Sequence, residues 1–157
     1  MDKINWCLKK KEGISLIEQN SNLSEAYIKK AEDSLKSMDI NIVKEWKIAT
    51  AYYTVYFSLY SILMKIGVKS EIHSCTIEFI RIFLYDYFSE EEINFIEDAQ
   101  RLRIDSQYYI NKNIPNQKYN ELLENAPNYL IKCKTILRKI NENEINRIRN
   151  KLKESMK

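Results

Sequence analysis

The chain has 157 residues, a normal length for one domain with its own hydrophobic core. Two glycines and two prolines are too few for a sheet joined by tight turns, so the composition favours helices. The formal net charge of +3 does not by itself indicate nucleic-acid binding, which needs a clustered basic excess.

Apolar spacing predicts two helices near the start of the chain. The first covers residues 2–19 and is interrupted by Gly13. Residues 20–22 read as a turn that caps the second helix, which covers residues 23–38. Apolar residues of the second helix recur at spacings of three and four, so they form one stripe and predict an amphipathic surface helix.

A third helix is predicted to begin with a cap at Asp39 or Asn41 and to end at Ile66, with Gly67 as its C-cap. It is apolar on nearly every side from Ile48 onward, so we expect it to be the core helix. Its length would suffice to cross a membrane. However, its tyrosines lie near the middle, whereas tyrosines of spanning helices prefer the two interfaces. We therefore expect no membrane insertion.

After a loop over residues 68–73, a fourth helix is predicted over residues 75–88. Ser89 and Glu92 then have the spacing of a capping box, in which each side chain binds a free backbone amide of the other. This box predicts the start of a fifth helix over residues 90–113, which ends before Pro115.

The last predicted element covers residues 117–153, with a bend at Pro127. Long helices with short connections predict an all-α fold, an up-and-down bundle of four to five main helices without a β-sheet. We expect a single domain over residues 1–157, with a basic helical extension over about 128–157. That extension can be a solvated helix face or an arm that contacts RNA or a partner.

The three cysteines, Cys7, Cys75 and Cys133, are widely spaced and form no CxxC or Cys/His cluster. His73 is the only histidine, so a zinc or other metal site has little support. We expect free thiols in a reducing compartment. The first residues also lack the order of a signal peptide, which predicts a cytoplasmic protein.

Two segments carry a more specific pattern. Residues 51–67 form a helix with paired tyrosines that ends in glycine, and residues 70–79 place a histidine just before the next helix. Residues 99–110 combine arginines with tyrosines. Together, over about residues 23–140, they resemble the HEPN superfamily and its small prokaryotic stand-alone proteins. The resemblance implies a bundle of four or five helices that often forms a dimer.

The resemblance also implies a chemistry. Many HEPN proteins are metal-independent ribonucleases with an Arg-x(4–6)-His motif. In the toxin group paired with a minimal nucleotidyltransferase, the motif is Arg-x4-His-x-Tyr. Such a reaction needs a group that exchanges a proton near neutral pH and a cation that holds phosphate, which histidine and arginine supply.

This sequence departs from the motif. If Arg101 is the motif arginine, Ser106 takes the histidine position and Tyr108 the tyrosine position. If Arg103 is the motif arginine, Tyr108 takes the histidine position. Neither register supplies an imidazole, and a tyrosine with an ordinary pKa of about 10 is a poor substitute base. This departure argues against ribonuclease activity.

The candidate ligand or partner site comprises Arg101, Arg103, Asp105, Tyr108, Tyr109 and His73. On one helix Arg101, Asp105 and Tyr108 share a face, and Arg103 lies about 200° around the helix from Arg101. If the family's pocket is present here, the resemblance implies that Arg101 would hold a phosphate by a forked contact, with the hydroxyl of Tyr108 beside it. Tyr108 would then be a ligand contact or, as the resemblance to the toxin group implies, an acceptor of nucleotide groups from a partner transferase.

Each of these residues also has a purely structural explanation. Arg101 and Asp105 can form an ion pair within the helix. His73 can cap or pack against the following helix, and the tyrosines of residues 51–67 can belong to the core.

Three functions stay open. The first is a non-catalytic or degenerate HEPN module that binds a nucleotidyltransferase-type partner, a nucleotide or RNA. The second is a metal-independent endoribonuclease toxin with an altered motif, and the third is a purely structural helical adaptor. No cofactor is expected, because phosphate-binding glycine loops and the Glu-x-x-His pattern of di-iron bundles are missing from the sequence. We expect a homodimer or a complex with another protein.

Overall fold

The computed structural model describes residues 2–157. Within them the chain forms seven helices and two short strands, in the order α1 (Lys3–Lys9), β1 (Ile14–Leu16), α2 (Ser21–Ile40), α3 (Lys44–Ile66), β2 (Val68–Ser70), α4 (His73–Phe83), α5 (Glu90–Tyr108), α6 (Asn116–Lys139) and α7 (Glu142–Ser155).

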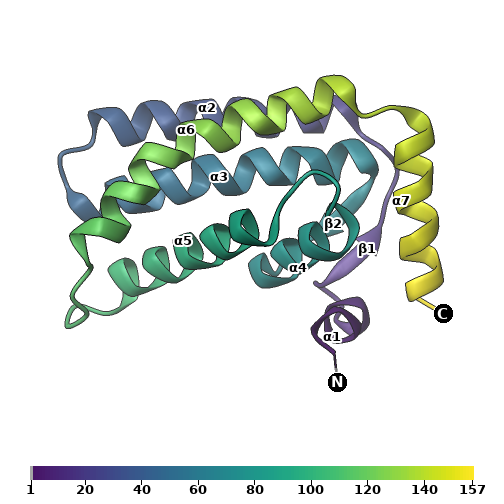
Figure 1. Cartoon of the computed structure of the whole chain (residues 1–157), viewed down its shortest axis with the longest axis horizontal. Helices are drawn as coiled ribbons and strands as arrows, with labels where there is room; N and C mark the ends of the chain where they lie inside the picture. Colours follow the sequence, from purple (N-terminus) through teal and green to yellow (C-terminus); the bar gives the residue numbers. More distant parts are fainter. Residues whose placement is uncertain (1) are drawn as a thin grey trace.

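Four long helices, α2, α3, α5 and α6, form an elongated bundle, with the short α4 continuing beyond the start of α5 (Figure 1). Helix α3 packs against α2, α6 and α5, so it occupies the centre. Helix α7 crosses one end of the bundle, and α1 lies near the same end (Figure 1). The predicted all-α helical bundle is therefore confirmed.

The central position of α3 follows from its sequence. Tyr52, Leu59 and Leu63 are fully buried, as expected for a helix that is apolar on nearly every side. The helix ends at Gly67, whose φ of 83° is left-handed and favours glycine, so the predicted C-cap is also confirmed. Along residues 2–157, we find no helix with the length and apolar character needed to cross a membrane.

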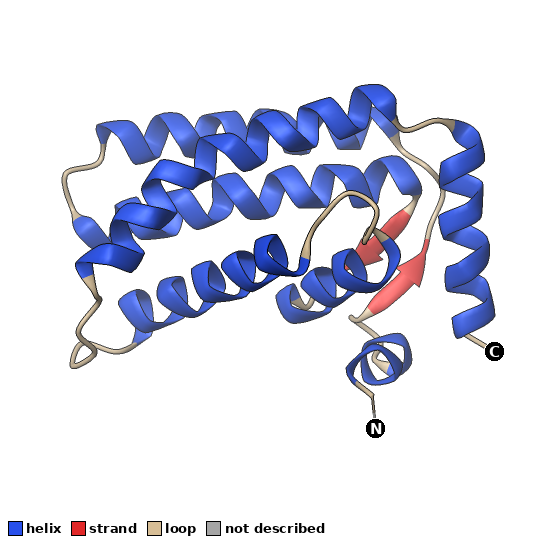
Figure 2. Cartoon of the chain, viewed as in Figure 1, coloured by secondary structure: helices blue, strands red, loops and turns tan. Residues whose placement is uncertain are grey.

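The start of the chain differs from the prediction of one helix over residues 2–19. Helix α1 ends at Lys9, and the chain then turns at Gly13, where an added Cβ would lie 1.8 Å from the carbonyl oxygen of Cys7. After this turn β1 pairs antiparallel with β2, with Ile14 opposite Ser70 (Figure 2). The expectation of a fold without a sheet was wrong, because β2 lies in the segment predicted to be a loop.

The turn at Gly13 also places α1 against α4. Cys7 and Cys75 are joined by a disulfide there, and both are fully buried. The expectation of three free thiols was therefore wrong for this pair. Cys133 is a free thiol buried in the bundle.

Several helix ends also differ. Asn41 does not cap α3; it closes α2 instead, because its side-chain amide donates to the carbonyl oxygen of Ser37 at 2.7 Å. Helix α4 runs over His73–Phe83 rather than 75–88, and α5 stops at Tyr108 rather than 113. The predicted capping box of Ser89 and Glu92 is formed.

The predicted last element is two helices. Pro127 lies inside α6 and does not end it. The break comes at Ile140 and Asn141, where Asn141 and Glu144 form a second capping box that starts α7. The chain therefore changes direction at this cap, and α7 packs across the end of α3.

Candidate functional site

Helix α5 carries most of the candidate residues. Its two arginines, Arg101 and Arg103, point in different directions. Arg101 is on the exposed face, where Nη1 lies 3.4 Å from Oδ1 of Asp98. Asp105 accepts a hydrogen bond from Nζ of Lys112 at 2.7 Å, so it does not form the ion pair expected with Arg101. Tyr108, at the end of α5, is 69% exposed.

Arg103 points inward, toward α3. Its guanidinium lies over the rings of Tyr52 and Tyr53, with Cζ 5.1 Å and 5.7 Å from their centroids. These are cation–π distances, and burial strengthens such contacts because water no longer competes for the charge. Nη1 donates to Oε1 of Gln107 at 3.2 Å, whereas the buried Nε finds no acceptor within residues 2–157.

His73 is the first residue of α4 and faces the same tyrosines. Its Nδ1 lies 2.8 Å from the hydroxyl oxygen of Tyr52, and its ring stacks on Tyr56 with centroids 4.0 Å apart. Burial, and secondarily the positive charge of Arg103, lowers the pKa of His73 from its ordinary value of 6.5 to about 4. The imidazole is therefore neutral at physiological pH.

Together Tyr52, Tyr53, Tyr56, His73 and Arg103 form what we call the arginine–tyrosine cluster. Burial raises the pKa of the Tyr52 and Tyr56 hydroxyls, so both stay protonated. The cluster thus holds the guanidinium of Arg103, a neutral imidazole, and two tyrosine hydroxyls that keep their protons. It can bind through hydrogen bonds and cation–π contacts more readily than it can exchange protons.

The structure divides the candidate residues into two groups. Arg103 and His73 both contact Tyr52, which belongs to the paired-tyrosine segment and was not among the predicted site residues. Arg101, Asp105, Tyr108 and Tyr109 lie on the outer face and at the end of α5. The pair of tyrosines in α3 was the sequence pattern that could have indicated Tyr52 as a site residue. The contacts of Tyr52 with α4 and α5 could not be predicted, because they depend on how three helices pack together.

A hollow at the end of α5 is lined by both α3 and α5. Its walls are Glu45, Trp46, Ser106, Gln107 and Tyr108. Tyr108 therefore faces a depression that also presents an indole and a carboxylate, whereas Arg101 lies two turns back along the helix.

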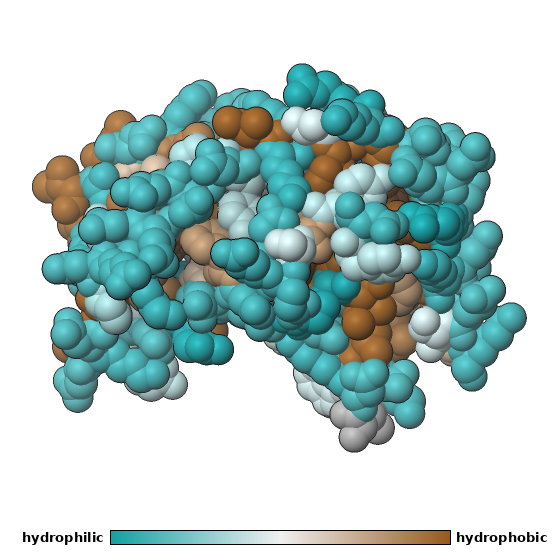
Figure 3. Space-filling model, in the orientation of Figure 1, coloured by the Kyte–Doolittle hydropathy of each residue, from teal (hydrophilic) through white to brown (hydrophobic). Residues whose placement is uncertain are grey.

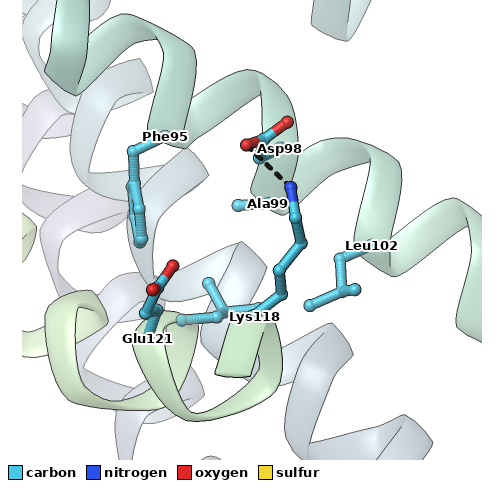
Figure 4. A pocket seen from close by; sticks show the side chains of 7 residues that line it. Phe95, Asp98, Ala99, Leu102, Lys118 and Glu121 are labelled. Carbon is cyan, nitrogen blue, oxygen red and sulfur yellow. Dashed lines mark hydrogen bonds and ion pairs between the residues drawn. The ribbon is translucent and has the colours of Figure 1, made fainter. Parts of the chain in front are cut away.

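Another pocket lies between α5 and α6 (Figure 4). Lys118 reaches across it, with Nζ 3.1 Å from Oδ2 of Asp98 (Figure 4). The remaining wall includes Phe95, Ala99 and Leu102. Asp98 and Lys118 thus pair across the opening, whereas the third charged group of the lining, Glu121, accepts a hydrogen bond from the side-chain amide of Gln117 at 3.0 Å.

A metal centre has no ligand set here. Within residues 2–157, no group of three or more His, Cys, Asp or Glu side chains comes together to hold a metal ion.

About half of the basic side chains of the extension make contacts inside the protein. Nη1 of Arg149 donates to the carbonyl oxygens of Ile17, Ile66 and Gly67 at 2.9, 2.9 and 2.8 Å. The other internal contacts of the extension are Lys132 with Glu92, Lys134 with Glu32, Arg147 with Asp86, and Lys151 with the ring of Tyr85. These contacts engage five of the nine basic side chains of the extension; among the described residues, Arg138, Lys139, Lys153 and Lys157 form no salt bridge.

Comparison with known proteins adds one match. A sequence model described as the HEPN domain matches residues 24–142, which covers most of α2, all of α3 to α6, and the first residue of α7. No curated protein matches the chain.

Proposed function

Because this chain belongs to the HEPN domain family, we propose that it is a non-catalytic member that acts by binding a nucleotidyltransferase-type protein partner. The observation that carries the proposal is the state of His73. The only imidazole of the chain is neutral, hydrogen-bonded to Tyr52 and stacked on Tyr56, and it belongs to α4 rather than to the motif segment in α5.

The family's ribonuclease reaction needs a group that gains and loses a proton near neutral pH. His73, with a pKa of about 4, is seldom protonated at pH 7 and is a weak base. The outer face of α5 offers Arg101 with Asp105 and Tyr108, and none of these is an imidazole. The arrangement supports binding rather than cleavage.

A protein partner is favoured over RNA by the distribution of charge. Binding of RNA draws most of its affinity from basic side chains that contact phosphates. In this chain five of the nine basic side chains of the extension are engaged internally, whereas the α5 face presents Arg101 with the hydroxyl of Tyr108. An exposed arginine and tyrosine are the residue types that dominate protein interfaces.

A second candidate function is a metal-independent endoribonuclease that uses the arginine–tyrosine cluster. One observation favours it: Arg103 and His73, the cation and the imidazole of the family chemistry, both contact Tyr52. The hydrogen bond to Tyr52 uses Nδ1, which leaves Nε2 of His73 for a substrate.

The first test is RNA cleavage. We expect the purified protein to leave total RNA intact in the presence of EDTA. Cleavage that resists EDTA and disappears in His73→Asn would refute the non-catalytic assignment and establish the second candidate.

The second test is partner binding. We expect the chain, co-expressed with a minimal nucleotidyltransferase from the same genome, to co-purify with it. Arg101→Ala and Tyr108→Phe should weaken the complex without changing the melting temperature, whereas Lys36→Ala on the exposed side of α2 should not weaken it. Failure of the wild-type proteins to co-purify would contradict the proposal.

A further inference from the structure

The hollow between the start of α3 and the end of α5 holds groups that the proposed function does not use. It has a volume of about 440 Å³, and its walls are Glu45, Trp46, Ser106, Gln107 and Tyr108. Figure 1 shows the α2–α3 and α5–α6 connections, which adjoin these two helix ends, at the end of the bundle opposite α7. Hydrophobic surface appears at this end in Figure 3. The volume falls within the range of about 300–1,000 Å³ that is typical of small-molecule sites.

Two aromatic side chains from different helices present their rings to the hollow. Trp46 of α3 is 56% exposed, and Tyr108 of α5 is 69% exposed. Within residues 2–157, neither ring packs against another aromatic ring or lies under a cation. The ring faces are therefore free for a ligand, and the negative face of an aromatic ring attracts cations.

The side chains of the hollow carry a negative charge. Glu45 is the one charged group of its walls, and this carboxylate forms no ion pair with any described residue. The neighbouring Lys44 reaches toward α6 instead, where its Nζ lies 4.8 Å from the ring centroid of Tyr119 and 3.4 Å from Oδ1 of Asn116. The charge of Glu45 is therefore available to a cation in the hollow.

The end of α5 adds a partial negative charge to the same hollow. The last carbonyl groups of a helix have no partner within the helix, and the helix dipole favours a cation beside them. Helix α5 is 19 residues long and has no basic side chain in its last turn. Lys112, which follows in the chain, has its Nζ 2.7 Å from Oδ1 of Asp105. The carboxylate of Glu45 and the end of α5 thus favour a positive charge from two helices.

Two further polar walls already have partners inside the protein. Oε1 of Gln107 accepts from Nη1 of Arg103 at 3.2 Å, and Oγ of Ser106 donates to the carbonyl oxygen of Arg103 at 3.0 Å. A primary ammonium ion has three N–H donors, each of which needs an acceptor. A quaternary ammonium ion has none and contacts aromatic faces directly. The walls therefore suit a quaternary ammonium ion better than a primary one.

A nucleotide fits these walls less well. Bases stack on aromatic rings, but phosphates draw their affinity from basic side chains. The walls, all within the described residues, include no basic side chain, and the carboxylate of Glu45 repels phosphate.

We infer that the hollow binds an organic quaternary ammonium ion, held against the rings of Trp46 and Tyr108 and beside the carboxylate of Glu45. The inference goes beyond the proposed function. It uses the ring of Tyr108, whereas the hydroxyl of Tyr108 is the group assigned to partner binding.

The test is a titration of isotope-labelled protein with tetramethylammonium chloride, followed by nuclear magnetic resonance of the indole Nε1–H groups. The chain has two tryptophans, so each gives one such signal. Trp6 is an internal control, because α1 lies at the other end of the bundle and Nζ of Lys10 is already 5.2 Å from the centroid of its ring. We expect the Trp46 signal to shift with a Kd on the order of 1 mM and the Trp6 signal to stay in place. Sodium chloride at the same concentrations should move neither signal.

Variants test the assigned walls with the same Trp46 signal. Glu45→Gln and Tyr108→Ala should each raise the Kd by about fivefold, through the loss of an exposed ion pair and of a cation–π contact. Tyr108→Phe keeps the ring and should bind as wild type does, even if it loses the nucleotidyltransferase. Glu154→Gln makes the same change of charge on α7, at the opposite end of the bundle, and should leave the Kd unchanged.

Two further ligands distinguish the sources of the head group. Choline represents a free small molecule, and the amide of Nα-acetyl-trimethyllysine represents a modified side chain of another protein. The tighter binder of the two identifies the source. The inference would be overturned if tetramethylammonium left the Trp46 signal in place, or if neither Glu45→Gln nor Tyr108→Ala raised the Kd. Equally tight binding of the unmethylated lysine derivative, or tighter binding of adenosine monophosphate, would overturn it as well.

Discussion

The charge state of His73 can be measured directly, because the chain contains one histidine. Burial, with a smaller contribution from Arg103, lowers its pKa from 6.5 to about 4. We expect nuclear magnetic resonance of the imidazole nitrogens, in protein without a histidine tag, to show a neutral ring at pH 6 and titration near pH 4.

The lowered pKa of His73 also makes the free energy of unfolding depend on pH. Because the pKa of His73 is lower in the folded than in the unfolded protein, the unfolded state takes up a proton first as the pH falls. The stabilisation from the neutral ring is fully present above about pH 6.5 and is lost between pH 6.5 and about 4. A difference of about 2.5 pKa units corresponds to about 3 kcal/mol.

The assay is urea denaturation of wild type and His73→Gln at pH 7.5 and pH 4. Carboxylates titrate in both proteins, so their contribution cancels in the difference between them. We expect the free energy of unfolding of wild type, relative to the variant, to fall by about 3 kcal/mol on acidification.

Two arginine variants separate the two causes of the lowered His73 pKa, which are burial and the positive charge of Arg103. Arg103→Gln should raise the pKa of His73 but leave it below 6.5, because burial remains. Arg101→Gln, on the outer face of α5, should leave it unchanged. A wild-type pKa near 6.5 would refute the reasoning and would restore His73 as a candidate acid or base.

Two further predictions concern stability. Arg149→Ala should lower the free energy of unfolding by about 3 kcal/mol, because three carbonyl oxygens lose a charged donor, whereas Lys153→Ala on the same helix should have little effect in urea denaturation. Replacing Cys7 and Cys75 by serine should cost about 4 kcal/mol through the entropy of a loop with a sequence separation of 68, measured in the same way. Thiol titration in denaturant should find only Cys133 before reduction and all three cysteines afterwards, and three thiols without reduction would contradict the disulfide.

Much of the helical fold could be predicted from local signals. The apolar character of α3, the glycine at its end and the capping box of Ser89 and Glu92 each act within a few residues, so the sequence displays them directly. The two strands could not be predicted in this way. Ile14 pairs with Ser70, and strands of three residues carry too little periodicity to be recognised.

The candidate site was also predictable only where it depends on local sequence. Helical spacing separates Arg101 from Arg103, but only the packing of α5 against α3 decides which of them turns inward. The contact between His73 and Tyr52 depends on the path of β2 between two helices. The disulfide likewise depends on the turn at Gly13, so the spacing of the cysteines gave no sign of it.

The segment that carries His73 is held by parts of the chain on both sides of the HEPN match over residues 24–142. Strand β1 pairs with β2 just before His73, Cys7 binds Cys75 just after it, and Arg149 binds the carbonyl oxygen of Gly67. These three links make the matched helices and the flanking segments thermodynamically interdependent, so they should unfold in one cooperative transition. A fragment limited to residues 24–142 would lack a partner for each link, and its histidine would titrate in different surroundings from those of the whole chain.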